Sequence, residues 1–336
     1  MRSAPRALVV FCAAAGPRLG FGHLVRCRSL ARALGVEPVI ALRGSRRTRD
    51  RATAMGGIVV DVSSAASLRA LEPSLVVIDD PSATHAGRWL RRARTAGVPV
   101  ATVHDLGLAY VASDVLIDGS LRTGAAPTGS DVLAGPAYAI LDPGVERTRH
   151  IRRRPRPTRI FIALGGGHHI HAAAATLTSA LARRLPRSDI RVARGFCPPR
   201  GLPSLARGTW IEAPNGLAGE LAEASVAIVA GGVTLYEACA LGVPVVAVAV
   251  TAAQHQTIRA AACHGAAIDG GALPLDARRG NDIAEAAARL LTNRARCARQ
   301  SRAARRLVDA RGAYRVAARL RALARRRRPG PKEGAA

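Results

Sequence analysis

The feature that most restricts the fold of this chain is a regular alternation of short apolar runs with segments of helix length. The alternation extends from residue 7 to about residue 120, breaks down between Arg122 and Pro157, and resumes from Arg159 to about Asp269. Strands separated by helix-length connections pair in parallel and form doubly wound sheets. The expected strands are 8–12, 38–42, 58–62, 75–78, 98–103, 115–117, 159–164, 225–230 and 245–250, and the expected helices include 23–34, 282–291 and 295–323.

This pattern predicts an α/β protein with two Rossmann-like, doubly wound domains, residues 1–140 and residues 159–323, the second of which includes the terminal helices. Residues 141–158 are expected to form the interdomain linker, and the basic tail 324–336 is expected to be disordered. Ligands collect at the carboxyl ends of parallel strands. We therefore expect the functional site in a cleft between the two domains.

A glycine-rich turn follows the first expected strand, 8–12, and leads into a helix. Gly20 and Gly22 allow the backbone to approach a ligand, and the free N–H groups of the helix start favour an anion. His23 lies in this turn, where it is a candidate general base, with a surface or capping role as the alternative. Arg26, one helical turn later, is expected to orient His23 or to neutralise a pyrophosphate, or else to be a solvated surface residue.

A second glycine-rich turn follows the strand 225–230. Gly231, Gly232 and Thr234 offer N–H and O–H donors to phosphates at the start of the next helix. Glu237 lies one turn further along, where a carboxylate suits the hydroxyl groups of a ribose. The alternative is a helix start whose dipole simply favours a glutamate.

Several other polar residues follow strand ends and are candidates for the walls of the site. Asp79, Asp80, His104 and Asp105 come after strands of the first domain, although each is equally compatible with capping a turn. Gln254 follows the strand 245–250 and suits sugar hydroxyls or a pyrophosphate, with a helix-surface role as the equal alternative.

These motifs resemble those of UDP-sugar enzymes with the two-domain GT-B fold. The resemblance is greatest to the UDP-2,4-diacetamido-2,4,6-trideoxy-altropyranose hydrolase of pseudaminic acid biosynthesis and to its spore-coat polysaccharide relatives, and it covers most of residues 7–270. The resemblance implies that His23 activates water and that the segment Gly231–Glu237 binds UDP. The matching segments are 20–27, 77–80, 104–106, 133–141 and 231–237.

One loop departs from that family. After the strand 159–164 the family tends to read Gly-Gly-Ser-Asp-Pro-x-Asn, whereas this chain keeps Gly165 and Gly166 but has His168 and His171 at the acidic and amide positions. The retained glycines are compatible with a loop beside a phosphate. No Asp, Glu or Cys accompanies the histidines, so hydrogen bonding to sugar or phosphate is favoured over metal binding. We expect neither a metal nor a cofactor.

The charge balance is strongly basic, with 50 Lys and Arg residues against 23 Asp and Glu residues. The arginines are scattered, no nucleic-acid motif accompanies them, and aromatic residues for base stacking are scarce, so specific nucleic-acid binding is not expected. Arginine-rich genome composition is the simpler explanation. The runs Arg152–Arg154 and Arg325–Arg328 remain candidates for weak contact with an anionic membrane surface.

The cysteine spacing and the N-terminus favour a cytoplasmic protein. The six cysteines are far apart without a Cys-x-x-Cys pair, which is typical of reduced thiols. The N-terminus superficially resembles a signal peptide, but its cleavage would remove the first strand, and no apolar run approaches the ~20 residues of a membrane span.

The resemblance therefore implies a metal-independent UDP-sugar hydrolase in cell-surface polysaccharide or nonulosonic acid biosynthesis. Water, activated by His23, would attack the anomeric carbon and release UDP. A GT-B glycosyltransferase, in which His23 deprotonates an acceptor hydroxyl, is the first alternative. A nucleotide-sugar-binding protein that has lost its chemistry is the second, and His168 and His171 are the departures that motivate it.

Overall fold

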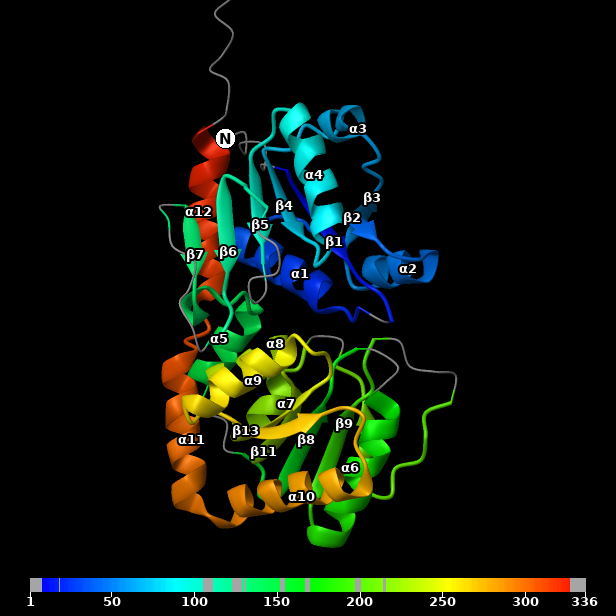
Figure 1. Ribbon diagram of the computed structural model, residues 1–336, viewed down its shortest axis with the longest axis vertical. Helices are drawn as coiled ribbons and strands as arrows, with labels where there is room; N and C mark the ends of the chain where they lie inside the picture. Colours follow the sequence, from blue (N-terminus) through cyan, green and yellow to red (C-terminus); the bar gives the residue numbers. More distant parts are fainter. Residues whose placement is uncertain are drawn as a thin grey trace, which may run out of the picture.

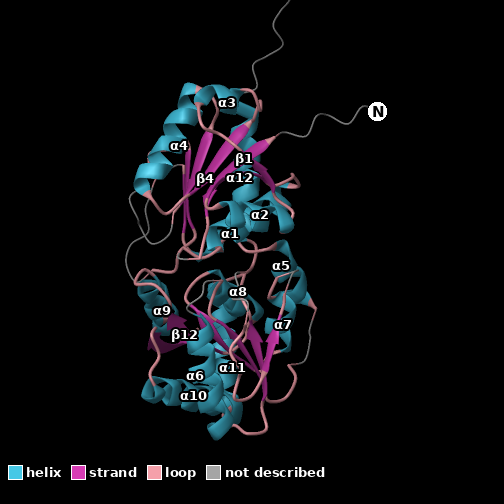
Figure 2. Cartoon of the chain, turned by 90° about the vertical axis from the view of Figure 1, so that its right-hand side faces the viewer, coloured by secondary structure: helices cyan, strands magenta, loops and turns pink. Residues whose placement is uncertain are grey.

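The computed structural model describes residues 8–17, 19–104, 111–122, 129, 131–151, 155–166, 170–196, 201–213 and 216–326. Asp105, Arg152–Arg154, His168 and the tail from residue 327 lie outside these ranges. Figure 1 shows two α/β domains, and Figure 2 shows helices flanking the strands in both.

The first domain contains a parallel sheet whose order, among the described residues, is β3-β2-β1-β4-β5-β6-β7. Its strands are β1 (Val9–Ala14), β2 (Val39–Arg43), β3 (Ile58–Val60), β4 (Leu75–Asp79), β5 (Val100–Val103), β6 (Val115–Asp118) and β7 (Val132–Ala134). Its helices are α1 (Gly22–Leu34), α2 (Arg46–Ala54), α3 (Ala65–Arg69) and α4 (Ala83–Thr95).

The second domain contains a parallel sheet whose order, in the same described ranges, is β10-β9-β8-β11-β12-β13. Its strands are β8 (Arg159–Ala163), β9 (Asp189–Ala193), β10 (Thr209–Ile211), β11 (Val226–Ala230), β12 (Val245–Ala249) and β13 (Ile268–Ala272). Its helices are α6 (Ile170–Arg184), α7 (Ala218–Glu223), α8 (Val233–Leu241), α9 (Gln254–Cys263), α10 (Ala277–Thr292) and α11 (Arg294–Leu307).

Side chains that alternate along the strands form a separate core on each face of each sheet. In β1, Phe11 packs in the same core as Leu30 of α1, whereas the neighbouring Cys12 packs with Leu90 of α4 on the opposite face. Strands buried on both faces consist of apolar residues throughout, which is why the sequence shows short apolar runs rather than alternation with polar residues. None of the described helices is long and apolar enough to span a membrane.

Helix α12 (Gly312–Arg326) corrects the expectation that residues 295–323 form one helical stretch of the second domain. The helical stretch is interrupted after Leu307, and Ala310 has a positive φ of 67°. Beyond this break, Val316 and Leu320 are buried in the core of the first domain beside α1, as the position of α12 in Figures 1 and 2 illustrates. The chain therefore crosses back, because the apolar face of α12 completes the helix layer that α1 begins.

The segment 141–158, expected as a linker, contains helix α5 (Pro143–His150). Asp142 caps this helix by accepting a hydrogen bond from the backbone N–H of Gly144, and Pro143 suits the first helical position. Val145 is fully buried in the core that α8 also lines. Packing of the second domain thus begins within the segment assigned to the linker.

The two domains meet through residues that follow the carboxyl ends of their strands. The ring of Phe21, after β1, lies 5.2 Å from the ring of Phe196, after β9. The backbone N–H of Leu121, after β6, donates a hydrogen bond of 2.9 Å to the hydroxyl of Tyr236 in α8. The carboxyl edges of both sheets therefore face one another.

Candidate active site

The first glycine-rich turn joins β1 to α1 through a closed backbone loop. Gly16 and Gly20 exchange backbone hydrogen bonds of 3.0 and 2.7 Å, and Gly20 has a φ of 79° that favours glycine. Phe21 is buried, and no side chain caps the first turn of α1. His23 is therefore held in an uncapped helical turn at the edge that faces the second domain.

His23, Arg26 and Asp79 form a hydrogen-bonded cluster. Nδ1 of His23 lies 2.7 Å from Oδ1 of Asp79, the last residue of β4. Arg26 donates from Nε to Oδ2 of Asp79 at 2.8 Å and from Nη2 to Oδ1 at 2.5 Å. The side chain of Asp79 is only 2% exposed, compared with 16% for His23, so the imidazole covers the carboxylate and itself reaches solvent.

The charge of Asp79 defines the chemical state of the cluster. Burial alone would raise the pKa of Asp79, but the positive charge of Arg26 and the contact with His23 outweigh burial and hold the pKa well below its usual range. Nδ1 of His23 also lies 3.0 Å from Nη2 of Arg26, a group that can only donate. An ionised carboxylate only accepts hydrogen bonds, so the 2.7 Å contact with Asp79 is a hydrogen bond in the tautomer that carries its proton on Nδ1. The neutral tautomer with its proton on Nδ1 has an unprotonated Nε2, which is the arrangement of a general base oriented by a third group.

The second glycine-rich turn lies between β11 and α8. A Cβ atom at Gly231 would come within 2.8 Å of Cγ1 of Ile258 in α9, so only glycine fits this approach of two elements. No side chain caps α8 at Gly232, and Thr234 is partly exposed in its first turn. Gln254 accepts a hydrogen bond from the N–H of Val250 through Oε1, and its Nε2 faces Gly232. This turn thus offers several donors at one helix start.

Glu237 lies one turn into α8 and is 7% exposed. Burial, with a smaller contribution from the negative charge of Asp142, raises the pKa of Glu237 to about 8. Among the hydrogen bonds and ion pairs of the described residues, none involves the side chain of Glu237. A buried carboxyl group without a protein partner can accept and, when protonated, donate hydrogen bonds to ligand hydroxyls.

Gly165 and Gly166 form the turn after β8, at the contact between the domains. Gly165 has a φ of 98°, and a Cβ atom at Gly166 would lie 2.7 Å from Cδ2 of Phe196 and 3.3 Å from Cδ2 of Phe21. The turn thus packs beneath the two aromatic rings that join the domains. The turn after β8 therefore lies against Phe21 of the first glycine-rich turn, and the convergence of that turn with the Gly231–Glu237 turn stays a prediction.

The cluster of His23, Arg26 and Asp79 and the glycine turns of the second domain each lie where the strand order of a sheet reverses. In the first sheet the reversal falls between β1 and β4, which carry the His23 turn and Asp79; in the second it falls between β8 and β11, which carry the two glycine turns. In open parallel sheets, ligands bind at such switch points. The sequence indicated Asp79 as a candidate for the wall of the site, but its contact with His23 became evident only from the strand order.

Two other candidates, Asp80 and His104, have defined surroundings in the fold. Both carboxylate oxygens of Asp80 accept hydrogen bonds from Arg43, at 2.8 and 2.7 Å, and Asp80 also accepts the backbone N–H of Ser82. Nε2 of His104 lies 3.0 Å from the hydroxyl of Thr102. These contacts give Asp80 and His104 structural partners, and their role toward a ligand stays a prediction.

The histidine loop after β8 is described only in part. His171 is buried in α6, and its ring lies 5.6 Å from that of Trp210. His168 and Asp105 lie outside the described residues. Within the described part of the chain, no group of three or more His, Cys, Asp or Glu side chains is placed to hold a metal ion.

No protein-family model matches the chain. The chain is 30% identical over 146 residues to the spore coat polysaccharide biosynthesis protein SpsG of Bacillus subtilis (strain 168). The match covers 41% of this chain and 43% of SpsG, which is less than half the length of that relative.

Solved structures are similar over nearly the whole chain. MurG of Acinetobacter baumannii matches with a TM-score of 0.62 and 17% identity, covering 94% of this chain and 99% of MurG. The glycosyltransferase SnogD of Streptomyces nogalater matches with a TM-score of 0.59 and 19% identity, covering 95% and 99%. The UDP-GlcNAc 2-epimerase of Neisseria meningitidis matches with a TM-score of 0.59 and 10% identity, covering 94% and 99%. The chain therefore has the GT-B fold, as the resemblance of its motifs implied.

Proposed function

We propose that this protein is a UDP-sugar hydrolase that releases UDP from a modified, diacetamido-type nucleotide sugar in cell-surface polysaccharide or nonulosonic acid biosynthesis. The observation that carries the proposal is the His23–Asp79–Arg26 cluster, in which a buried carboxylate contacts Nδ1 of His23 at the edge that faces the second domain. A proton on Nδ1 leaves Nε2 of the neutral ring free to act as a base. The partial similarity to SpsG supports a role in polysaccharide biosynthesis.

In the proposed reaction, Nε2 of His23 takes a proton from water while the water oxygen forms a bond to the anomeric carbon. The bond between that carbon and the diphosphate oxygen breaks, and UDP leaves with the electron pair. Asp79 stabilises the imidazolium that forms, and Arg26 keeps Asp79 ionised and in place. General base catalysis of this kind contributes about 10²–10⁴-fold to a rate.

The second domain would hold the nucleotide. The uncapped start of α8 at Gly232 and Thr234 suits the phosphates, since free N–H groups and the helix dipole favour anions. Glu237 suits the ribose hydroxyls, because it is buried and lacks a hydrogen-bonding partner among the described residues. Gln254 adds an amide donor beside Gly232.

A glycosyltransferase on the same fold is the second candidate. The observation that favours it is the likeness to MurG and to the glycosyltransferase SnogD. His23 would then take the proton from an acceptor hydroxyl rather than from water, and every other role would be unchanged. UDP release from a panel of UDP-sugars, measured with and without acceptor sugars, separates the two: release without acceptor supports the hydrolase, and release only with acceptor replaces it by the transferase.

The role of the cluster is tested by Asp79→Asn, with Asp80→Asn as the matched comparison. Both variants remove a buried carboxylate held by an arginine, but only Asp79 touches His23. Nitrogen-15 NMR of the histidine side chains reports which ring nitrogen is protonated. In Asp79→Asn the new amide can donate to Nδ1, so we expect the proton to move to Nε2 and UDP release to fall about 10²-fold or more. In Asp80→Asn the tautomer of His23 is expected to stay unchanged. An unchanged tautomer and rate in Asp79→Asn would refute the proposed role.

A further inference from the structure

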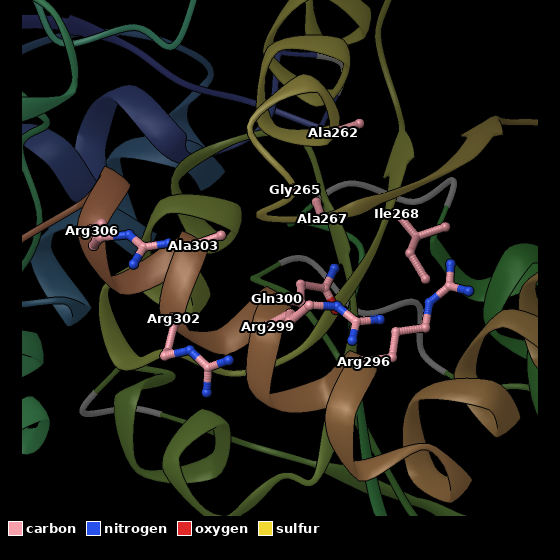
Figure 3. Close-up of a pocket in the computed structure, with 10 residues that line it drawn as sticks. All are labelled: Ala262, Gly265, Ala267, Ile268, Arg296, Arg299, Gln300, Arg302, Ala303 and Arg306. Atoms are coloured by element: carbon pink, nitrogen blue, oxygen red, sulfur yellow. The ribbon is translucent and has the colours of Figure 1, made fainter.

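A groove lies on the second domain between helix α11 and the end of α9, with β13 at its floor (Figure 3). It has a volume of about 540 Å³. The start of β13, at Ile268, lines it, whereas the candidate active site lies at the opposite, carboxyl ends of the strands. The groove is therefore separate from the proposed nucleotide site.

Four arginines of α11 line the groove: Arg296, Arg299, Arg302 and Arg306. Their spacing places them along one side of the helix over about 15 Å, at 1.5 Å per residue. Figure 3 shows the guanidinium group of Arg296 extending toward Ile268, with Arg299 beside Gln300. All four arginines are exposed.

These arginines differ from many others of the chain in lacking carboxylate partners. Elsewhere, Arg184 and Arg289 share Glu285, and Arg311 pairs with Glu146. Within the described residues, no ion pair involves any of the four groove arginines. The groove therefore presents a row of positive charge that the protein itself does not neutralise.

A second, independent observation comes from Gln300, which lines the same groove and is 6% exposed. Its Nε2 donates a hydrogen bond of 2.9 Å to the carbonyl oxygen of Val245. Its Oε1 is buried and has no hydrogen-bond partner among the residues that the structure describes. A buried acceptor without a partner is costly, and a hydroxyl group of a ligand would satisfy it.

The carbonyl end of α9 also faces this region and works against an anion. Backbone N–H groups of His264, Gly265 and Ala266 already bond the last carbonyls of that helix. The remaining helix dipole is equivalent to about half a negative charge, which is small beside four guanidinium groups. The net potential of the groove is therefore positive.

The lining selects the class of anion. The exposed large apolar side chains of the described residues (Leu19, Ile58, Ile151 and Tyr314) all lie outside the groove, so it lacks the apolar anchors that insert into a membrane surface. The lining also contains no aromatic ring on which bases could stack. A linear array of charges beside a hydroxyl acceptor fits a chain that carries both acidic groups and hydroxyls.

We propose that this groove binds a segment of an anionic oligosaccharide, with its carboxylate or phosphate groups on the arginines of α11 and a hydroxyl group on Oε1 of Gln300. The binding site is independent of the nucleotide sugar and of the proposed hydrolysis. It would hold an acidic glycan on the outer side of the second domain while the site at the carboxyl edge of the sheet hydrolyses the nucleotide sugar.

The test measures binding of fluorescein-labelled oligogalacturonate by fluorescence anisotropy at fixed salt concentration. The groove variant combines Arg296→Gln, Arg299→Gln and Arg306→Gln. The control variant makes the same change of charge on α2 with Arg47→Gln, Arg49→Gln and Arg51→Gln, which are exposed residues of the first domain. Polyacrylate, which has carboxylates without hydroxyls, and phosphatidylglycerol vesicles are the comparison ligands.

We expect the groove variant to weaken oligogalacturonate binding about tenfold or more, because three charge contacts are lost. The control variant is expected to bind almost as the wild type does, and polyacrylate to bind less tightly than oligogalacturonate. UDP release by the groove variant should equal that of the wild type. The proposal would be overturned if the control variant lost as much affinity for oligogalacturonate as the groove variant does. It would also be overturned if the wild type bound polyacrylate as tightly as oligogalacturonate, or bound the vesicles alone.

Discussion

The buried carboxyl group of Glu237 predicts a specific dependence of stability on pH. Its pKa is raised from 4.5 to about 8, first by burial and then by Asp142. In the unfolded chain the group loses its proton above pH 4.5, whereas the folded protein keeps that proton until about pH 8. The stabilisation from this group is therefore fully present below pH 4.5 and is lost as the pH rises to 8.

The size of the effect follows from the shift. Each pKa unit corresponds to 1.36 kcal/mol, so between pH 4.5 and pH 7 the group lowers the free energy of unfolding by about 3 kcal/mol. Glu237→Gln replaces the carboxyl group by an amide of the same shape that does not titrate. In this variant we expect no such fall in the free energy of unfolding. The difference in the pH dependence of stability between wild type and variant should therefore be largest toward neutral pH.

The assay is urea unfolding at a series of pH values between 4.5 and 8, followed by circular dichroism. Glu37→Gln is the matched control, because Glu37 is exposed and the same charge is removed. The control should follow the wild-type curve, while Glu237→Gln should become relatively more stable as the pH rises. Parallel curves for wild type and Glu237→Gln would show that Glu237 is not buried as described.

Three further predictions concern binding, turnover and the chain crossing. Glu237→Ala should weaken UDP binding by about 1–3 kcal/mol, the cost of unpairing buried hydroxyls, and calorimetry that finds equal affinity would remove Glu237 from the site. His23→Ala should abolish UDP release while leaving UDP affinity nearly intact, and steady-state kinetics that show a wild-type rate would make His23 a turn residue only. Gly312→Ala should destabilise the protein by about 1–3 kcal/mol, because its Cβ would come within 2.7 Å of the backbone nitrogen of Ala139. Gly219→Ala, at an open helical position, should cost nothing in the same thermal melt, and equal melting temperatures for both variants would contradict the crossing geometry.

The sequence predicted strands β1 to β6 of the first sheet and β8, β11 and β12 of the second, because strands buried on both faces leave a strong local signal; β7, β9, β10 and β13 were not predicted. The expected strand 8–12 corresponds to β1 (Val9–Ala14), and 245–250 corresponds to β12 (Val245–Ala249). The helix expected after the first glycine turn is α1, which begins at Gly22. In each case the apolar pattern and the neighbouring glycines indicated the same element.

Other elements left a weaker signal. β13 (Ile268–Ala272) contains two glycines, and β10 (Thr209–Ile211) is very short, so neither stands out as an apolar run. The break after Leu307 has no proline, and it is marked by the positive φ of Ala310 and by Gly312 at the start of α12. The return of α12 to the first domain depends on an apolar face that fits either domain equally well in the sequence, and only three-dimensional packing decides between them.

The contact between His23 and Asp79 shows what a single sequence can and cannot provide. Asp79 ends a strand that lies 56 residues from His23 in the chain, and only the strand order brings the two together. Ala13 of β1 is paired in register with Asp79 of β4, so the end of β4 lies beside the turn that leaves β1. The same reversal recurs between β8 and β11, where the glycine turns of the second domain lie. Because a reversal of strand order leaves a crevice that no crossover helix covers, both sheets place their candidate site residues where open parallel sheets bind ligands.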